Sequence, residues 1–156
     1  MTAVTVRFEA MEHYDQSLGL PGYQTTHSAG ADIIACLYEK HDITILPGQR
    51  VLIPTGLKVA IPQGFEGQVR PRSGLSLKTS LMVVNSPGTI DSDYRGELKI
   101  LMGNLGAEPV VVSHGDRVAQ LVINPVVQAR FELVEQLDQT LRGEGGFGST
   151  GVRVDH

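Results

Sequence analysis

The residues most able to do chemistry lie in one loop, at positions 85–97, where Gly88 and Gly96 bracket two aspartates. Asp91 follows apolar Ile90, and partial burial there would raise the pKa of the carboxyl and make it a usable general base. A solvated acidic turn explains the same residues equally well. The acids lack the spacing of an EF-hand, so the loop does not indicate calcium binding. On these residues alone, a catalytic base and an ordinary turn both remain open.

A second segment, residues 71–78, combines groups that suit phosphate. Arg72, Ser73 and Gly74 stand where a strand is expected to end and a short helix to begin over 73–80, with Ser73 as its cap. Such a junction offers a guanidinium, a hydroxyl and free backbone N–H groups, and the glycine lets a ligand approach the backbone. An ordinary helix cap beside a surface arginine is the alternative interpretation.

A third candidate is Gln120, which interrupts the apolar alternation of Val118 and Leu121 in the segment 115–121. Its amide is either turned toward an interior site or satisfied within a core strand, and the residues do not decide between the two.

The C-terminal segment, residues 142–151, has a composition unlike the rest of the chain. It is no Walker loop, because it lacks the terminal Gly-Lys-Ser/Thr, but it holds Arg142, an isolated Phe147 and two adjacent hydroxyls. Such a segment could wrap a phosphate chain while the phenyl ring stacks on a base, which contributes about 1–3 kcal/mol. Composition alone equally fits a disordered terminus. We therefore expect one β domain over 1–141 and a flexible arm over 142–156.

The elements that must position these groups are short strands separated by strong turn signals. Most are rich in Val, Ile and Leu, and several alternate with period two. The expected strands cover residues 4–8, 50–53, 57–61, 67–70, 81–84, 97–102, 109–113, 117–123 and 126–134. This rhythm predicts an all-β sandwich or barrel with little helix.

The composition limits the class of function. With 156 residues, of which 41% are hydrophobic and 19% charged, the chain fits one soluble globular domain. Its net charge of −4 argues against binding a nucleic-acid polymer but leaves room for a nucleotide enzyme. The single cysteine, Cys36, excludes an intrachain disulfide and is expected to be a buried small hydrophobe. We find no leader peptide and no run of membrane-spanning length, so we expect a cytoplasmic protein without a membrane partner.

Together these segments resemble the family of homotrimeric dUTP pyrophosphatases. Five motifs stand in the family's order across most of the chain, and the last is long and specific. They are residues 29–33, 71–75, 85–97, 115–121 and 142–151. Ala31 stands where the family often has Tyr, and Ser76 stands where Ala is common. Neither side chain is expected to touch the chemistry.

The resemblance implies a jelly-roll-like β fold and a homotrimer with three composite active sites. The implied reaction is the Mg²⁺-dependent hydrolysis of dUTP to dUMP and pyrophosphate. This reaction limits uracil incorporation into DNA and supplies dUMP for dTMP synthesis. The C-terminal arm would close over an active site, as it does in the family by crossing to a neighbouring subunit.

The resemblance also implies roles at the phosphates. Asp91 would deprotonate a water that attacks the α-phosphorus in line. Mg²⁺ would be held mainly by the triphosphate, with Asp32 reaching it through water. The residues that would grip the phosphates are Arg72, Ser73, Gly74 and Gln120.

At the nucleoside, the resemblance implies that Tyr94 packs on the deoxyribose. The uracil edge would meet Asn85, Gly88, Thr89, Ile90 and Lys99. From the arm, Phe147 would cover the base, and the γ-phosphate would be clamped by Arg142, Gly148, Ser149 and Thr150.

Two other functions remain as alternatives at this point. A dCTP deaminase shares the fold, but the Tyr94-bearing loop and the stacking arm favour the pyrophosphatase. A catalytically silent nucleotide sensor or protein-binding module would be expected to lack Asp91 or the arm, and this sequence carries both.

Overall fold

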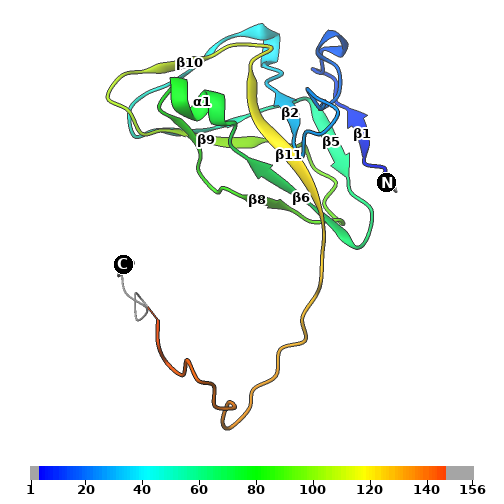
Figure 1. Cartoon of the computed structure of the whole chain (residues 1–156). Coiled ribbons are helices and arrows are strands. Elements are labelled where there is room, and N and C mark those ends of the chain that lie inside the picture. Colours follow the sequence, from blue (N-terminus) through cyan, green and yellow to red (C-terminus); the bar gives the residue numbers. More distant parts are fainter. Residues whose placement is uncertain (1–3, 147–156) are drawn as a thin grey trace.

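The fold is almost entirely antiparallel β-sheet, as predicted, and it is seen in a computed structural model that describes residues 4–146 (Figure 1). Its strands are β1 (Arg7–Ala10), β2 (Ala31–Ile34), β3 (Ile43–Ile45), β4 (Arg50–Ile53), β5 (Leu57–Ala60), β6 (Phe65–Arg70), β7 (Leu81–Val83), β8 (Gly88–Ile90), β9 (Ile100–Asn104), β10 (Val110–Val112) and β11 (Arg117–Pro125). The helical elements are α1 (Ser73–Lys78) and two 3-10 turns, η1 (Gln16–Leu18) and η2 (Tyr38–Lys40). None of the described helices is long and apolar enough to cross a membrane.

The sheets pack in the manner of a jelly roll. The largest has the order β2-β11-β6-β8, a second has the order β4-β9-β7, and two pairs, β1-β5 and β10-β3, complete the body. All pairings among the described strands are antiparallel, so no crossover helix is needed.

An aliphatic core joins the two larger sheets, because alternate residues of their strands point inward. Ile33, Val69 and Leu121 come from the first sheet, and Ile53 and Ile100 come from the second. The chain has no Trp, so branched aliphatic side chains supply most of the buried volume. Cys36 is fully buried, as expected of a small hydrophobe.

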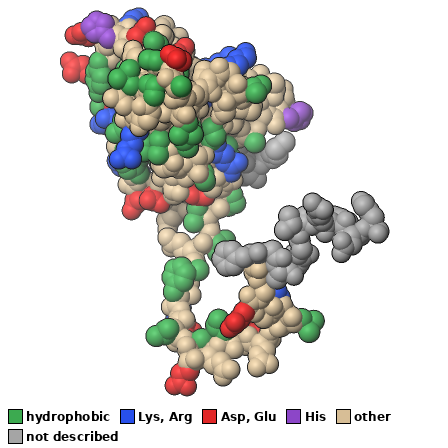
Figure 2. All heavy atoms as spheres, turned by 90° about the vertical axis from the view of Figure 1, so that its left-hand side faces the viewer, with side chains coloured by type: hydrophobic (Ala, Val, Ile, Leu, Met, Phe, Trp, Pro, Cys, Tyr) green, Lys and Arg blue, Asp and Glu red, His purple; other side chains and the backbone are tan. Residues whose placement is uncertain are grey.

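The strand predicted over residues 126–134 is wrong. Val126 donates its N–H to the Gly64 carbonyl at 2.9 Å, and after it the chain runs away from the body (Figures 1 and 2). A strand needs a neighbouring backbone to bond, and this segment finds none in its own chain among the described residues. Val127, Phe131 and Leu133 are at least 93% exposed, so their hydrophobicity produced a strand signal without a strand.

The short helix lies where it was expected, but its cap differs. Ser73 is the first helical residue, and Arg72 occupies the cap position with no side-chain capping bond. The serine hydroxyl is therefore not used to close the helix end. The strands β2, β3 and β8 were not predicted.

Asp15 ties η1 to the rest of the body. Its Oδ2 lies 2.7 Å from the Lys40 Nζ and 3.2 Å from the His114 Nε2. Its Oδ1 accepts the Ser17 N–H at 2.9 Å. The bond from Lys40, reinforced by those from Ser17 and His114, holds the pKa of this carboxyl well below its ordinary value of 3.8.

We predict that Asp15→Asn lowers stability at neutral pH by removing the attraction for Lys40 while an oxygen remains to cap η1. A depressed carboxyl pKa contributes stability that is present above the unfolded pKa and lost as the pH falls through the folded one. The difference in unfolding free energy between wild type and variant should therefore shrink below about pH 3.8. Chemical denaturation across pH tests this, with exposed Asp42→Asn as control. A difference that stays constant with pH would contradict it.

Candidate active site

One cavity brings residues predicted to bind the nucleoside together with Asp91, the predicted general base. Its volume is about 370 Å³, and it lies along β8 and the loop that follows this strand. The predicted residues that line it are Asn85, Gly88, Thr89, Ile90, Asp91, Tyr94 and Lys99. The sequence stretch 85–99 therefore folds back on itself to form the walls of a single site.

Pairing between β8 and β6 fixes the wall of this cavity. Gly88 stands opposite Val69 and Ile90 stands opposite Gly67. A Cβ atom at Gly88 would lie 3.0 Å from the Asn85 amide nitrogen, so the glycine allows this amide to rest against the strand. The result is a side-chain amide and a strand backbone presented side by side.

Tyr94 stands at the cavity with its ring fixed at one end. Its hydroxyl donates to the Glu97 carbonyl at 2.9 Å, and a Cβ atom at Gly96 would overlap the same hydroxyl. The residue is 44% exposed, so part of it remains available to a ligand. Gly96 is thus required for the position of the tyrosine.

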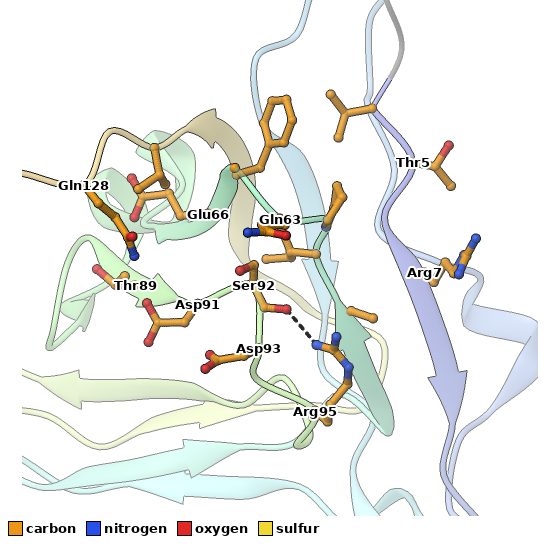
Figure 3. A pocket seen from close by; sticks show the side chains of 17 residues that line it. Thr5, Arg7, Gln63, Glu66, Thr89, Asp91, Ser92, Asp93, Arg95 and Gln128 are labelled. Carbon is orange, nitrogen blue, oxygen red and sulfur yellow. Dashed lines mark hydrogen bonds between the residues drawn. The ribbon is translucent and has the colours of Figure 1, made fainter.

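Asp91 lies where the 370 Å³ cavity meets a larger open groove of about 1510 Å³. Figure 3 shows its carboxylate near Asp93, with Arg95 directed instead to the Ser92 carbonyl at 2.7 Å. Asp91 is exposed, so the partial burial expected after Ile90 is not found in the single chain. Its carboxylate is open to water, which a general base must reach.

The residues predicted to bind phosphate lie together on the side of β6 away from β8, toward β11 and β2. Asp32, 7% exposed, accepts the Arg72 Nε at 2.8 Å and the Arg117 Nη1 at 3.1 Å. Gln120 donates to the Pro71 carbonyl at 2.8 Å, so its amide secures the backbone just before Arg72. Ser73 and Gly74 are exposed at the start of α1.

Two members of these groups were missed as site residues. Arg117 shares the carboxylate of Asp32, and Glu97 is one of the residues that line the 370 Å³ cavity. Both stand inside motifs that the sequence analysis quoted, but the signal for a role lay in their partners. Arg117 and Asp32 are 85 positions apart, and no local pattern predicts such a contact.

The two groups do not meet within one chain. Asp91 follows the Ile90–Gly67 pair near the start of β6, whereas Arg72 lies beyond its end (Figure 1). The five residue-to-residue steps from Gly67 to Arg72 span up to about 16 Å. The Arg72 side chain also turns to Asp32 on β2, on the opposite side of β6 from β8. The described chain therefore contains two half-sites.

Of the predicted arm residues, the structure describes only Arg142, and it is at neither half-site. Arg142 is exposed and donates to the Gly145 carbonyl at 2.7 Å within the arm. The predicted ligands Phe147, Gly148, Ser149 and Thr150 lie outside the described residues.

Mg²⁺ fits this site only as an ion that enters with a phosphate-bearing substrate. Among residues 4–146 no group of three or more His, Cys, Asp or Glu side chains could hold a metal. Both Asp32 oxygens already accept from arginines. A site of this kind suits Mg²⁺, which keeps several waters and is usually held through one or two carboxylates and substrate phosphates.

Comparison with known proteins gives a consistent result. A family model described as dUTPase matches residues 16–151. The deoxyuridine 5'-triphosphate nucleotidohydrolase of Roseobacter denitrificans is 52% identical over 151 residues, covering 97% of this chain and 99% of that protein. The protein of the same name from Desulfotalea psychrophila is 58% identical over 137 residues, covering 88% and 90%.

Solved structures agree. A mutant dUTPase of Staphylococcus bacteriophage 80alpha with dUpNHpp is 27% identical, with a TM-score of 0.80 and coverage of 95% of this chain and 99% of that one. A mutant dUTPase from phage phi11 of S. aureus, described with a structural Mg(II) ion, is 25% identical, with a TM-score of 0.73 and coverage of 86% and 99%.

Asp32→Ala should lower the unfolding free energy by about 1–3 kcal/mol, because it leaves Arg72 and Arg117 without their shared acceptor. The loss stays below that of a fully buried pair, since both arginines are partly exposed. Chemical denaturation measures it, and exposed Asp42→Ala is the control, expected within about 0.5 kcal/mol of wild type. Equal effects of the two variants would show that the arginines do not depend on Asp32.

Proposed function

The chain belongs to the dUTPase family and hydrolyses dUTP to dUMP, and on that premise we propose that Asp91 activates the attacking water. The observation that carries this is the position of Asp91 at the mouth of a cavity whose remaining lining suits a nucleoside. The reaction lowers the dUTP available to DNA synthesis and supplies dUMP for dTMP synthesis.

Uracil is recognised by the wall formed by β8 and Asn85. A side-chain amide and strand backbone groups together offer both donors and acceptors, which is what the edge of a pyrimidine requires. The Thr89, Ile90 and Lys99 backbones complete this edge recognition. A base with the wrong donors leaves buried polar groups unpaired, and sites of this kind reject such analogues strongly.

Tyr94 distinguishes the sugar. Its ring, anchored by its hydroxyl to the Glu97 carbonyl, packs on the deoxyribose and leaves no room for a 2'-hydroxyl. Specificity for the deoxynucleotide therefore depends on a side chain that does not move when the ligand enters.

The chemical step needs one proton transfer and one in-line displacement. The Asp91 carboxylate takes a proton from a water while the water oxygen bonds to the α-phosphorus. The bond from this phosphorus to the bridging oxygen breaks on the opposite side, and pyrophosphate leaves with its electrons. The products are dUMP and pyrophosphate, and exposure of Asp91 to solvent lets it release the proton afterwards.

The phosphates are held by the second half-site. Arg72 is oriented by Asp32, and its backbone is secured by Gln120 through Pro71. Ser73 and the Gly74 backbone add exposed donors. The triphosphate would hold Mg²⁺, with Asp32 contributing through water, and the ion would supply neutralisation of the phosphate charge.

A homotrimer with composite sites explains why one chain carries two separated half-sites. Asp91 and Arg72 lie near opposite ends of β6, with Arg72 turned away from β8. A closed ring of three copies brings the nucleoside half-site of one subunit to the phosphate half-site of another.

The segment between β11 and the arm supports the same assembly. Its apolar side chains, including Phe131, Leu133 and Leu137, are at least 78% exposed in the single chain and stand away from the body (Figure 2). Burial of these side chains on a neighbouring copy removes apolar area from water. The segment 142–156 then reaches a neighbour's site, where Phe147 covers the base and Arg142, Gly148, Ser149 and Thr150 hold the γ-phosphate.

Asp91→Asn should keep dUTP binding but lower kcat by at least about 10², because the amide cannot accept the proton from water. Pyrophosphate release from dUTP measures turnover, and equilibrium binding of the non-hydrolysable dUpNHpp measures affinity. Asp93→Asn is the matched control, since it changes a neighbouring carboxylate in the same loop. Turnover near wild type in Asp91→Asn would remove the proposed base.

Mixing subunits tests the composite site. Arg72→Ala and Asp91→Asn should each be nearly inactive alone. When equal amounts are unfolded together and refolded into mixed trimers, about a quarter of the sites pair an intact Asp91 with an intact Arg72. Pyrophosphate release should recover to about that fraction of wild type. No recovery in trimers shown to be mixed would mean that both residues serve a site from the same subunit.

A further inference from the structure

We infer that Glu97 is a positioning residue that sets the sugar specificity of the nucleoside cavity, an inference that rests on the role proposed for Tyr94. Glu97 is a buried carboxylate, 9% exposed, and the mechanism above does not use its side chain. A buried charge is costly unless it is paired and hydrogen-bonded, so its partners indicate its role.

The Glu97 carboxylate binds the turn between β4 and β5. Its Oε1 accepts the backbone N–H groups of Thr55 at 3.2 Å and Gly56 at 2.9 Å. The Thr55 hydroxyl donates to the Leu98 carbonyl at 2.6 Å, and the Leu98 N–H donates to the Leu57 carbonyl at 2.8 Å. These bonds fasten the end of the nucleoside loop to a strand turn of the core.

Two residues of the cavity depend directly on Glu97. The Tyr94 hydroxyl donates to the Glu97 backbone carbonyl at 2.9 Å. The Lys99 Nζ lies 3.3 Å from the Glu97 Oε2. The same residue therefore fixes the tyrosine through its backbone and the lysine through its side chain.

A histidine supports the carboxylate from below. The His13 Nε2 lies 3.4 Å from the Glu97 Oε1, is buried, and has no hydrogen-bond partner among the described residues. The His13 ring stacks on Tyr38, with centroids 4.1 Å apart. The N-terminal segment thus places an imidazole beside the Glu97 carboxylate.

Removal of the Glu97 carboxylate should affect the discrimination between dUTP and UTP more than it affects kcat. Loss of the carboxylate removes its bonds to Thr55 and Gly56 and loosens residue 97, whose carbonyl anchors Tyr94, while the backbone bonds of Leu98 remain. A ring that can shift admits a 2'-hydroxyl, so discrimination between dUTP and UTP falls. The Asp91 side chain takes part in none of these bonds, and only its backbone carbonyl meets this stretch, where it accepts the Tyr94 N–H at 3.2 Å. We therefore expect kcat for dUTP to change less than discrimination does.

The test compares kcat/KM for dUTP and UTP in Glu97→Ala and Glu97→Gln. Glu97→Ala should reduce the dUTP preference roughly tenfold or more and raise KM for dUTP more than it lowers kcat. Glu97→Gln keeps an oxygen for Thr55 and Gly56 but loses the charge that attracts Lys99, so its loss should be smaller. The glutamine variant keeps the test open if the alanine variant does not fold.

Two further measurements separate positioning from mere destabilisation. Asn104→Ala removes another buried polar side chain, one that donates to the Ile45 and Glu108 carbonyls outside the cavity, and it should lower stability without changing the dUTP preference. In a Tyr94→Phe background, the effect of Glu97→Gln on the preference should largely vanish, because both changes act through one anchor.

The outcomes are distinguishable. An unchanged dUTP preference in folded Glu97→Ala and Glu97→Gln overturns this inference and leaves the proposed function intact. Full additivity of Glu97→Gln with Tyr94→Phe overturns it as well. A wild-type protein without preference for dUTP over UTP overturns the proposed role of Tyr94 and this inference together.

Discussion

The organisation of the site depends on one constraint, the pairing of β6 with β8 on one edge and β11 on the other. The β8 edge presents the strand backbone, Asn85 and Asp91 to a nucleoside. The β11 edge leads to Asp32 on β2 and to the arginine that follows β6. The two groups therefore lie on different edges of β6 within the chain. The separation is a property of the sheet, and the proposed assembly of several chains would bring the two groups together.

Buried carboxylates support both half-sites without reacting themselves. Asp32 holds Arg72 and Arg117, and Glu97 holds a strand turn and Lys99. In each case the charge is nearly removed from water and is compensated by charged or backbone donors, which makes its geometry well defined. Asp91, the proposed base, is exposed by contrast. The fold thus buries the two acids that hold other groups and leaves the proposed base where water can reach it.

The segment between β11 and the arm is the part of the chain whose sequence pattern and structure disagree. Residues 126–134 have the composition of a strand, yet in the single chain they have no neighbouring backbone to bond and their apolar side chains face solvent. Such a segment is stable only against another surface. The same hydrophobic pattern that fails to predict secondary structure here is consistent with a contact between copies, which links the assembly to the composite site.

The sequence alone determined the all-β class, the position of most strands, the short helix after β6 and the loop that forms the nucleoside cavity. These follow from local patterns, because alternation, turns and motif spacing act over a few residues. Only the tertiary structure decided that Asp91 is exposed, that Gln120 bonds the Pro71 carbonyl, and that Arg117 and Glu97 support the site. The bond from Arg117 joins positions 85 apart, and that from Gly56 to Glu97 joins positions 41 apart. Pairings at such range are set by sheet register and burial, which no local stretch of sequence encodes.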